Sequence, residues 1–446
     1  MFSYPQILIF VICSIQSLQI EFDSKIDMQR RKLIGFALPL VINPAVFAGS
    51  ICRESKYRAD VNIVANSFPV IQHLAKVAKS CASDGLKVNV KLTSKVQNEV
   101  EIAFSSSGKS PFDAAVVSAS VFNDLYSKNQ LYSLKGLVNK FKDPHKIEER
   151  MIVRMNGEPM AIAFMQNTQV LYYRRDIFKR LGLSVPKTYD EMFATAAIIK
   201  KLDPAIANPI AQCFSKGWDL ATEFTNVISS LGGRFFQEGT ALPAFNSEQG
   251  VQAIELMRQM LPYMSPNALA SNADDVMNQL QQGRAAMGVL WASRASRMDD
   301  PTASKVVGLI DFAPAPAARV GGGTAAHLWW DGVVMPRNGP NQRDATFAVL
   351  MEMLSESSVE SGNDLAIWVR SNFKPGRAST GVKLAMEAGA KIWPAEPFFN
   401  LAHLQLGKVL ADAVKGLRDP AQALAGAAEA YKQSAIEKSF LKRDLA

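Results

Sequence analysis

The stretch DVNIVANSFPVIQHLAKVAKSCASDGLKVNVKL, residues 60–92, contains the repeating unit from which the fold is predicted. Residues 61–65 form a short apolar run that predicts a strand, and residues 66–69 then start a helix that ends near Gly85. Residues 86–92 alternate apolar and polar side chains, as a half-buried strand does. Strands separated by helices of this length are typical of parallel α/β units.

The same alternation continues along the chain. Thr188 and Glu191 fit a capping box, so a helix is expected from residue 189. After Pro336 the pattern is mostly helical to the end of the chain. Further strands are expected at residues 113–117, 159–173 (one long extended segment), 208–214, 285–291, 306–312 and 328–335. The expected fold class is therefore α/β.

The composition of the 446 residues is that of a soluble folded protein, with 48% hydrophobic and 20% charged residues. The length predicts two or three domain-sized units. The formal net charge is +8, but the lysines and arginines are dispersed along the chain. Because a nucleic-acid footprint needs clustered cations, nucleic acid is not expected as a partner.

Two apolar stretches lie near the N-terminus, and the second predicts export. It follows the basic residues 30–32 and ends at Val46 and Ala48, which fit the small positions of a cleavage site. We expect translation to start at Met28, residues 1–27 to be a start-site artefact and residues 28–48 to be a signal peptide. The alternative is a membrane anchor at residues 5–20, which is shorter than the roughly 20 residues that span a bilayer.

Three cysteines follow residue 48, namely Cys52, Cys81 and Cys213. An odd, small number does not form a disulfide framework. Two interpretations of Cys52 and Cys81 stay open. They pair in an oxidising periplasm, or they are buried free thiols.

Signatures of catalysis, of metal binding and of cofactor binding are missing from the sequence. The four histidines, His73, His145, His327 and His403, have no metal partners at helical spacing. No nucleophile elbow and no complete phosphate-binding loop occurs. We therefore expect no enzymatic activity, no metal and no cofactor.

All six tryptophans lie at or after residue 218. Trp218 begins a predicted helix, Trp291 ends a predicted strand, and Trp329 and Trp330 open another. Ligands of open α/β sheets bind at such strand ends, where an indole can stack on the apolar face of a sugar ring. The alternative is that the indoles fill the core. The adjacent pair favours binding, because neighbouring strand residues face opposite ways.

Several motifs occur in a fixed order between residue 157 and the C-terminus. They are GEPMAI at 157–162, NTQVLYYRRDIF at 167–178, TYDE at 188–191, GRAAM at 283–287, DGVVMP at 331–336 and DPAQAL at 419–424. This order resembles the family 1 extracellular solute-binding proteins, the group that contains maltose-binding protein. The resemblance covers nearly the whole chain after residue 48, and its specificity comes from the order of the motifs. Arg174-Arg175 departs from the usual Asn-Lys of the second motif.

The resemblance implies the two-lobed periplasmic binding protein fold, type II-like, in which a multi-segment hinge joins two discontinuous α/β lobes. Residues 53–163 plus 313–356 would form lobe 1, and residues 164–312 plus 357–446 would form lobe 2. The ligand would lie between the lobes.

The tryptophan pattern and the resemblance together predict the ligand contacts. Lys216 and Arg294 are further possible donors, interpreted as surface residues. The predicted ligand-binding residues are Asn66, Ser67, Ser118, Ser120, Gln166, Asn167, Trp218, Trp291, Trp329, Trp330 and Asp331.

The function that the resemblance implies is ligand capture for an ABC importer. A monomer in the periplasm would bind a sugar or polyol and deliver it to permease subunits in the inner membrane. Two alternatives stay open. A polyamine or sugar phosphate would need several acids or converging arginines, and the predicted site contains only Asp331 as an acid. An exported hydrolase would need a nucleophile and a base, which the histidine contexts do not supply.

Overall fold

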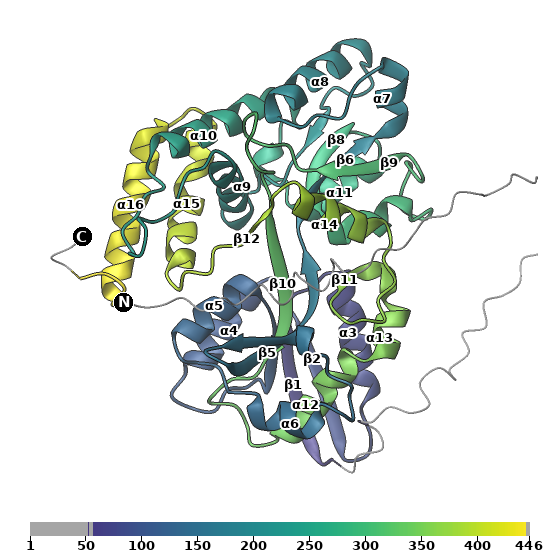
Figure 1. Ribbon diagram of the computed structural model, residues 1–446, viewed down its shortest axis with the longest axis vertical. Coiled ribbons are helices and arrows are strands. Elements are labelled where there is room, and N and C mark those ends of the chain that lie inside the picture. Colours follow the sequence, from purple (N-terminus) through teal and green to yellow (C-terminus); the bar gives the residue numbers. More distant parts are fainter. Residues whose placement is uncertain (1–51, 53–56, 443–446) are drawn as a thin grey trace, which may run out of the picture.

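The computed structural model describes residue 52 and residues 57–442. They form two lobes, each with its own β-sheet, and long strands connect one lobe to the other (Figure 1). The α/β class expected from the sequence is confirmed. The expectations for residues 1–48 lie outside the described residues.

The first lobe contains the larger sheet. Its strands are β1 (Ala59–Ala65), β2 (Leu86–Leu92), β3 (Ala114–Ser118), β4 (Ile152–Met155), β5 (Glu158–Asn167), β10 (His327–Val334), β11 (Ile367–Trp368) and β12 (Lys391–Ile392). The strand order is β11-β5-β10-β3-β1-β2, with β4 paired to β5 and β12 to β10. Strands β1, β2 and β3 are parallel, and β10 runs antiparallel to both β3 and β5.

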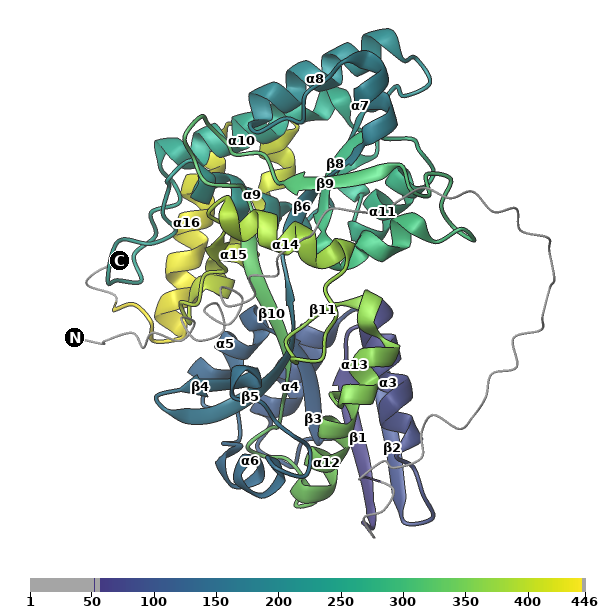
Figure 2. The same ribbon diagram turned by 45° about the vertical axis from the view of Figure 1, so that its right-hand side comes forward.

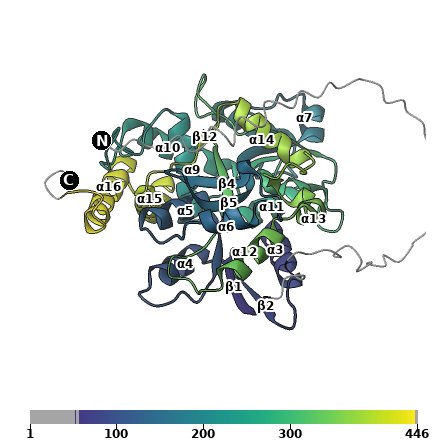
Figure 3. The same cartoon turned by 60° about the horizontal axis from the view of Figure 1, so that its bottom comes forward.

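Helices cover this sheet on both faces. They are α3 (Pro69–Ser80), α4 (Val96–Ser105), α5 (Ala119–Ser127), α6 (Lys135–Phe141), α12 (Arg343–Met353) and α13 (Glu356–Ser361). Figure 3, seen from the first lobe, shows α12 beside α3, although about 270 residues separate them. The core of the first lobe is therefore closed by a segment from the last third of the chain.

The second lobe is built on a smaller sheet of the order β7-β8-β6-β9. Its strands are β6 (Gln169–Arg174), β7 (Ile210–Ala211), β8 (Met287–Trp291) and β9 (Ile310–Pro314), and its helices are α7 (Arg175–Leu181), α8 (Tyr189–Leu202), α9 (Trp218–Ser230), α10 (Glu248–Met260), α11 (Ala273–Gln281), α14 (Arg377–Glu387), α15 (Phe399–Val414) and α16 (Pro420–Glu437). Leu171 packs on one face of the sheet, whereas Val170 and Tyr172 pack on the other. Both faces are thus buried, as in an α/β layer structure.

Short 3-10 helices complete the chain. They are η2 (Glu149–Met151), η3 (Leu261–Tyr263), η4 (Ala268–Ala270), η5 (Ala292–Asp299) and η6 (Asn363–Leu365). Among the described residues, none of the helices combines the length and the apolar character needed to cross a membrane.

The chain passes between the lobes along a few extended segments (Figure 2). Strand β5 of the first sheet leads through Thr168 into β6 of the second, and β11 pairs with β5 before the chain continues to α14. The lobe boundaries expected from the sequence stay predictions. Val359 and Trp368 pack with the core of the first lobe. This favours a position later than residue 357 for the point where the chain leaves the first lobe for the last time.

Most predicted elements are present, but several differ. The strand predicted at 208–214 is β7, with only two residues, and the strand predicted at 306–312 is β9, which begins at Ile310. Strand β2 has the predicted bounds, Leu86–Leu92. The predicted extended segment 159–173 is two strands, β5 and β6, in different sheets. The mostly helical region after Pro336 also contains β11 and β12, two residues each, which owe their existence to pairing with distant strands.

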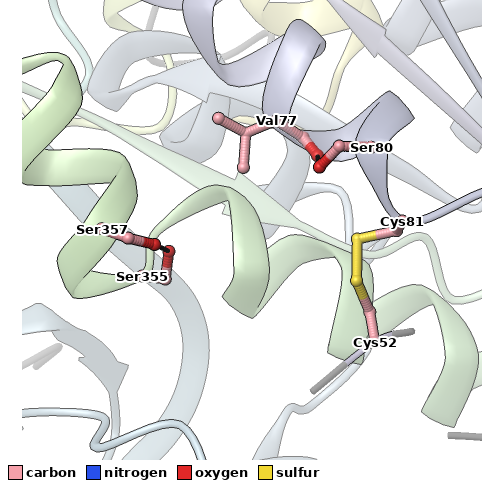
Figure 4. The surroundings of a disulfide bond; sticks show 6 residues. All are labelled: Cys52, Val77, Ser80, Cys81, Ser355 and Ser357. Carbon is pink, nitrogen blue, oxygen red and sulfur yellow. Dashed lines mark hydrogen bonds between the residues drawn. A yellow bond between two sulfur atoms is a disulfide. The ribbon is translucent and has the colours of Figure 1, made fainter. Parts of the chain in front are cut away.

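A disulfide joins Cys52 to Cys81, and Cys213 is a buried free thiol (Figure 4). Cys81 caps the C-terminal end of α3. Of the two interpretations left open by the sequence, the structure shows the disulfide, which ties residue 52 to the first lobe.

Candidate functional site

Four tryptophans of the second lobe form one group, here called the indole cluster: Trp218, Trp291, Trp329 and Trp393. The ring centroid of Trp218 lies 6.4 Å from that of Trp291 and 5.7 Å from that of Trp329. Trp329 also lies 5.6 Å from Trp291 and 3.9 Å from Trp393. The structure thus brings three of the predicted tryptophans together, and Trp393 joins them from the segment after β12.

Two glycines place Trp218 in the indole cluster. Gly217 caps α9 with a φ of 93°, a left-handed conformation that favours glycine. Gly407 of α15 packs directly on it, because a Cβ at this position would lie 2.9 Å from the Gly217 carbonyl oxygen. Helix α15 therefore approaches the start of α9, and the ring of His403 on α15 lies 5.9 Å from that of Trp218.

The members of the indole cluster differ in exposure. Trp218 keeps 41% of its surface exposed, whereas Trp329 and Trp393 keep only 6% and 2%. Trp291 is half-buried, and its backbone carbonyl accepts a 2.7 Å hydrogen bond from the Tyr172 hydroxyl. Trp218 and Trp291 are therefore the faces that a ligand could reach first, and the other two form the layer beneath them.

Trp330 lies apart from the indole cluster. It is half-buried, packs with the core of the first lobe, and its ring contacts that of Phe122 on α5 at 5.1 Å. Alternation along β10 accounts for this separation, because Trp329 and Trp330 point to opposite sides of the strand. Trp330 is thus positioned to serve a site only from the side of the first lobe.

Polar groups of the first lobe gather where β3 and β10 pair. Asp331 is the register partner of Ser118, so their side chains lie on the same face. The Ser118 and Ser120 hydroxyl oxygens are 3.1 Å apart and share a hydrogen bond. The Asp331 carboxylate is half-buried and, within the described residues, has no hydrogen bond or ion pair. Burial raises its pKa to about 7.

Asn66 and Ser67 follow β1, which is parallel to β3, so they lie at the same edge of the sheet as Ser118. Both are exposed. The Asn66 side-chain oxygen accepts from the Ser67 backbone N–H at 2.7 Å, and the Ser67 hydroxyl accepts from Gln72 at 3.4 Å. These two residues are accessible to a ligand at that edge.

Gln166 and Asn167 end β5 and have different surroundings. The Asn167 amide is used within the protein, because it donates to the Ser293 hydroxyl at 3.1 Å and accepts from the backbone N–H groups of Ser293 and Thr168 at 3.2 and 3.1 Å. Gln166 is half-buried and is the register partner of Trp330 on β10. Asn167 thus bonds the connection between β5 and β6 to η5. The amide of Gln166 is therefore the one more available to a ligand.

One hydrogen bond joins helix α15, which contacts the indole cluster, to helix α5 of the first lobe. The Asn400 amide of α15 donates to the Ser120 backbone carbonyl of α5 at 2.9 Å, although 280 residues separate them. Asn400 lies one turn before His403, which contacts Trp218. The sequence does not predict Asn400 or His403 as site residues, because both occur in a helical pattern whose neighbours are set by tertiary contacts.

Lys216 and Arg294, the two further possible hydrogen-bond donors, differ in their exposure. Lys216 is exposed, as expected. Arg294 is not a surface residue, because only 13% of its side chain is exposed and it pairs with Asp274 at 2.9 Å. Its charge is therefore already compensated.

Two cavities of the second lobe lie away from the predicted residues. One, of about 270 Å³, includes Asp190 and Glu255 in its lining, and the other, of about 400 Å³, includes Asp275 and Arg284. Among the described residues, no group of three or more histidines, cysteines, aspartates or glutamates is arranged to hold a metal ion.

Comparison with known proteins gives one consistent result. The family model for bacterial extracellular solute-binding proteins matches residues 83–359. A probable ABC transporter-binding protein of Deinococcus radiodurans is 26% identical over 181 residues, which are 38% of this chain and 43% of that protein. A mannitol-binding protein of Pseudomonas aeruginosa is 24% identical over 189 residues, 42% of this chain and 41% of that protein. The aligned stretches therefore span less than half of either relative.

The fold is also found among solved structures. An ABC transporter solute-binding protein of Agrobacterium vitis with bound D-mannitol superimposes with a TM-score of 0.72 at 17% sequence identity, covering 86% of this chain and 100% of that one. At this identity the likeness shows the fold, and the two-lobed binding-protein architecture expected from the sequence is confirmed.

Proposed function

The chain belongs to the bacterial extracellular solute-binding protein family, and we propose that it captures a sugar or polyol between its two lobes for an ABC importer. The relatives named above, a mannitol-binding protein and a mannitol-bound structure, support a polyhydroxylated ligand. The permease subunits of the importer are the proposed macromolecular partner, and the proposed binding unit is a monomer.

The observation that carries the proposal is that the strands between the lobes have an aromatic surface on the side of the second lobe and a polar surface on the side of the first. The indole cluster supplies aromatic faces from the second lobe, and Asp331, Ser118 and Ser120 supply polar groups from the first. An indole face covers the C–H face of a sugar, and a carboxylate or hydroxyl bonds its hydroxyl groups. A ligand held by both lobes stabilises their closed arrangement, because only that arrangement provides all the contacts.

A neutral ligand fits the charges better than a charged one. Asp331 is the only acid among the predicted contacts, whereas a polyamine needs several. Arg294 is already paired with Asp274, so it offers no free cation to a phosphate. Asn167 is likewise bonded within the protein, which leaves Gln166 as the amide at the first crossing.

Export is part of the proposal. Residues 28–48 would be removed as a signal peptide, with translation starting at Met28. The disulfide between Cys52 and Cys81 supports an oxidising compartment such as the periplasm, because such bonds are rare in reducing ones. The bound compound is released unchanged, since the proposed activity is binding without turnover.

A thermal-shift screen of residues 49–446 tests the ligand class. Sugars, polyols, polyamines and sugar phosphates are each added to the protein, and a ligand well above its Kd raises the Tm. The proposal expects a shift with a neutral carbohydrate such as D-mannitol or maltose. Stabilisation by polyamines or sugar phosphates alone contradicts the ligand assignment, and conversion of the bound compound contradicts binding without turnover.

A further inference from the structure

A chain of buried hydrogen bonds runs through the second lobe beneath the indole cluster. We call its members the Glu223 network. Glu223 accepts from the Gln169 and Gln212 amides at 2.8 and 2.6 Å. Gln169 in turn accepts from the Asn226 amide at 2.5 Å, and the Asn226 oxygen bonds His327 Nδ1 at 2.7 Å. All five residues are at most 3% exposed.

The Glu223 network connects elements that are distant in sequence. Glu223 and Asn226 lie on α9, Gln169 begins β6 directly after the first crossing, and His327 begins β10. The Thr168 hydroxyl adds a direct link between the two crossings, because it donates to the His327 carbonyl at 2.9 Å. Helix α9 is thus bonded to both strands that lead to the first lobe.

Trp218 and Trp329 lie on elements that supply members of the network, and Trp291 lies on a strand that pairs with one of these elements. Trp218 lies on α9, five residues before Glu223. Trp291 is the register partner of Gln169, and Trp329 follows His327 by two residues on β10. A shift of α9 relative to the crossing strands would therefore separate Trp218 from Trp291 and Trp329.

Apolar burial is non-directional, whereas hydrogen bonds depend on both direction and distance. We propose that Glu223 is a positioning residue for ligand capture, which holds the faces of Trp218, Trp291 and Trp329 in place by tying helix α9 to the two crossing strands. The inference about ligand capture rests on the proposed function. The positioning of the indoles does not.

The charge state of the network supports this role. Burial raises the pKa of Glu223 to about 8, and the nearby Asp219 on the same helix acts in the same direction. Burial lowers the pKa of His327 to about 3, so its ring is neutral and Nδ1–H donates to Asn226. The other titratable groups facing Glu223 are Tyr189 of α8 and the Cys213 thiol. All the network members are therefore neutral at pH 7.

A neutral Glu223 also needs an acceptor for its proton. The Gln212 side-chain oxygen is buried and has no hydrogen-bond partner in the described part of the chain. The 2.6 Å separation between the Glu223 and Gln212 side chains is typical of an O–H···O bond. In the neutral state, rotation of the Gln212 amide by half a turn exchanges its nitrogen and oxygen, so that the Glu223 hydroxyl donates to the Gln212 oxygen in place of accepting from the Gln212 nitrogen.

Ligand-free protein gives the first test, by near-UV circular dichroism and tryptophan fluorescence between pH 6 and 9.5. Wild type should show a change in the indole signals with a midpoint near the Glu223 pKa of about 8. Glu223→Gln, which stays neutral and keeps the shape, should show none. Tyrosine ionisation affects both proteins and cancels in the difference. Indole signals of wild type that follow those of Glu223→Gln at every pH would overturn the proposal.

The pH dependence of the free energy of unfolding tests the same ionisation of Glu223. The native state keeps a proton that the unfolded chain loses near pH 4.5, so the contribution of Glu223 to the free energy of unfolding falls as the pH rises from 4.5 to about 8. Glu223→Gln should therefore melt at a higher temperature than wild type at pH 9, and the difference should shrink towards pH 5. An equal difference at both pH values contradicts a buried neutral carboxyl.

Affinity for the carbohydrate gives the second test, with D-mannitol as the probe and Thr225→Val as the matched control. Thr225 is also fully buried on α9, but its hydroxyl bonds only the Ala221 carbonyl of the same helix. At pH 7, Glu223→Ala should weaken binding about tenfold, while Glu223→Gln and Thr225→Val stay within about twofold of wild type. Equal losses in Glu223→Ala and Thr225→Val would reduce the role of Glu223 to stability and overturn the proposal. If wild type binds no carbohydrate, the proposed function fails, and the ligand-free spectra still decide the positioning role.

Discussion

Trp329 and Trp330 are consecutive residues of β10, yet their indoles pack in different lobes. The Trp329 ring packs against Trp393 in the second lobe, and the Trp330 ring contacts Phe122 in the first. The strand that carries them pairs with β3 and β5 of the first sheet and begins with a residue of the Glu223 network. A single strand therefore couples the aromatic wall of one lobe to the polar groups of the other.

The exposed member of the indole cluster should control affinity. Trp218→Ala removes the most accessible face, and a lost aromatic contact of this kind costs about 1 kcal/mol, so Kd should rise about fivefold. Isothermal titration with the carbohydrate selected by the thermal-shift screen measures this. The control is Leu417→Ala, a residue that is 74% exposed and outside the indole cluster. An unchanged Kd in Trp218→Ala would show that the indole cluster does not contact the ligand.

Trp330→Ala should also weaken binding, and it should lower the Tm as well. Its ring packs on Phe122 and the core of the first lobe, so truncation leaves a cavity there. The loss of stability distinguishes this variant from Trp218→Ala. Chemical denaturation and titration on the same preparation separate the two effects, and full affinity in Trp330→Ala would exclude Trp330 from ligand contact.

The Asp331 carboxyl should make affinity depend on pH. Because burial raises its pKa to about 7, the group gains its charge between pH 6 and 8. An ionised carboxylate accepts stronger hydrogen bonds from ligand hydroxyls than a neutral one. Affinity should therefore rise from pH 6 to about 7 in wild type, below the Glu223 midpoint, and stay flat over the same interval in Asp331→Asn. Parallel pH profiles for the two proteins would contradict a direct contact.

Two buried histidines should make the protein sensitive to acid. Burial lowers the pKa of His327 and of His403 from 6.5 to about 3. Between these pH values the two histidines bind protons in the unfolded chain but not in the native state. The free energy of unfolding therefore decreases as the pH falls from 6.5 towards 3. His403→Phe, which fits the surrounding rings, should lose less stability than wild type between pH 7 and pH 4. Urea unfolding at both pH values tests this, and an equal loss in both proteins contradicts it.

Reduction of the disulfide should destabilise the first lobe and leave the site intact. Cys52 and Cys81 are 29 residues apart, and closing a loop of this size is worth about 2–4 kcal/mol. Replacing both with serine should lower the Tm with little change in Kd. Cys213→Ser should keep its response to reductant, because Cys213 is not part of the bond. A large change in Kd in the double variant would place the disulfide in the binding mechanism.

The sequence predicts the elements whose signals are local. Strand β2 alternates apolar and polar residues, and α8 begins at Thr188, whose side chain accepts from the Glu191 N–H. Strand β12 has only two residues and both are exposed, so no periodicity marks it. Its pairing with β10 depends on residues 64 positions away in the chain.

The sequence predicts which residues belong to the site better than it predicts how they are arranged in space. The sequence predicts Trp218, Trp291 and Trp329 as site residues because each stands at the boundary of a predicted element, where open α/β sheets bind their ligands. Their division from Trp330 depends on the register of β10, which adjacent residues alone do not define. Glu223 lies in a helix that is buried almost all round, and its partner Gln169 is 54 residues away. Only the tertiary fold identifies such a hydrogen-bond network.

A crystal structure of residues 49–446 with the carbohydrate that gives the largest thermal shift would show whether both lobes hold the ligand. We expect ligand density in contact with the Trp218 face of the second lobe and with Asp331 of the first, within one enclosed volume. Density that touches a single lobe, or that fills the outer cavity lined by Asp275 and Arg284, would contradict this expectation.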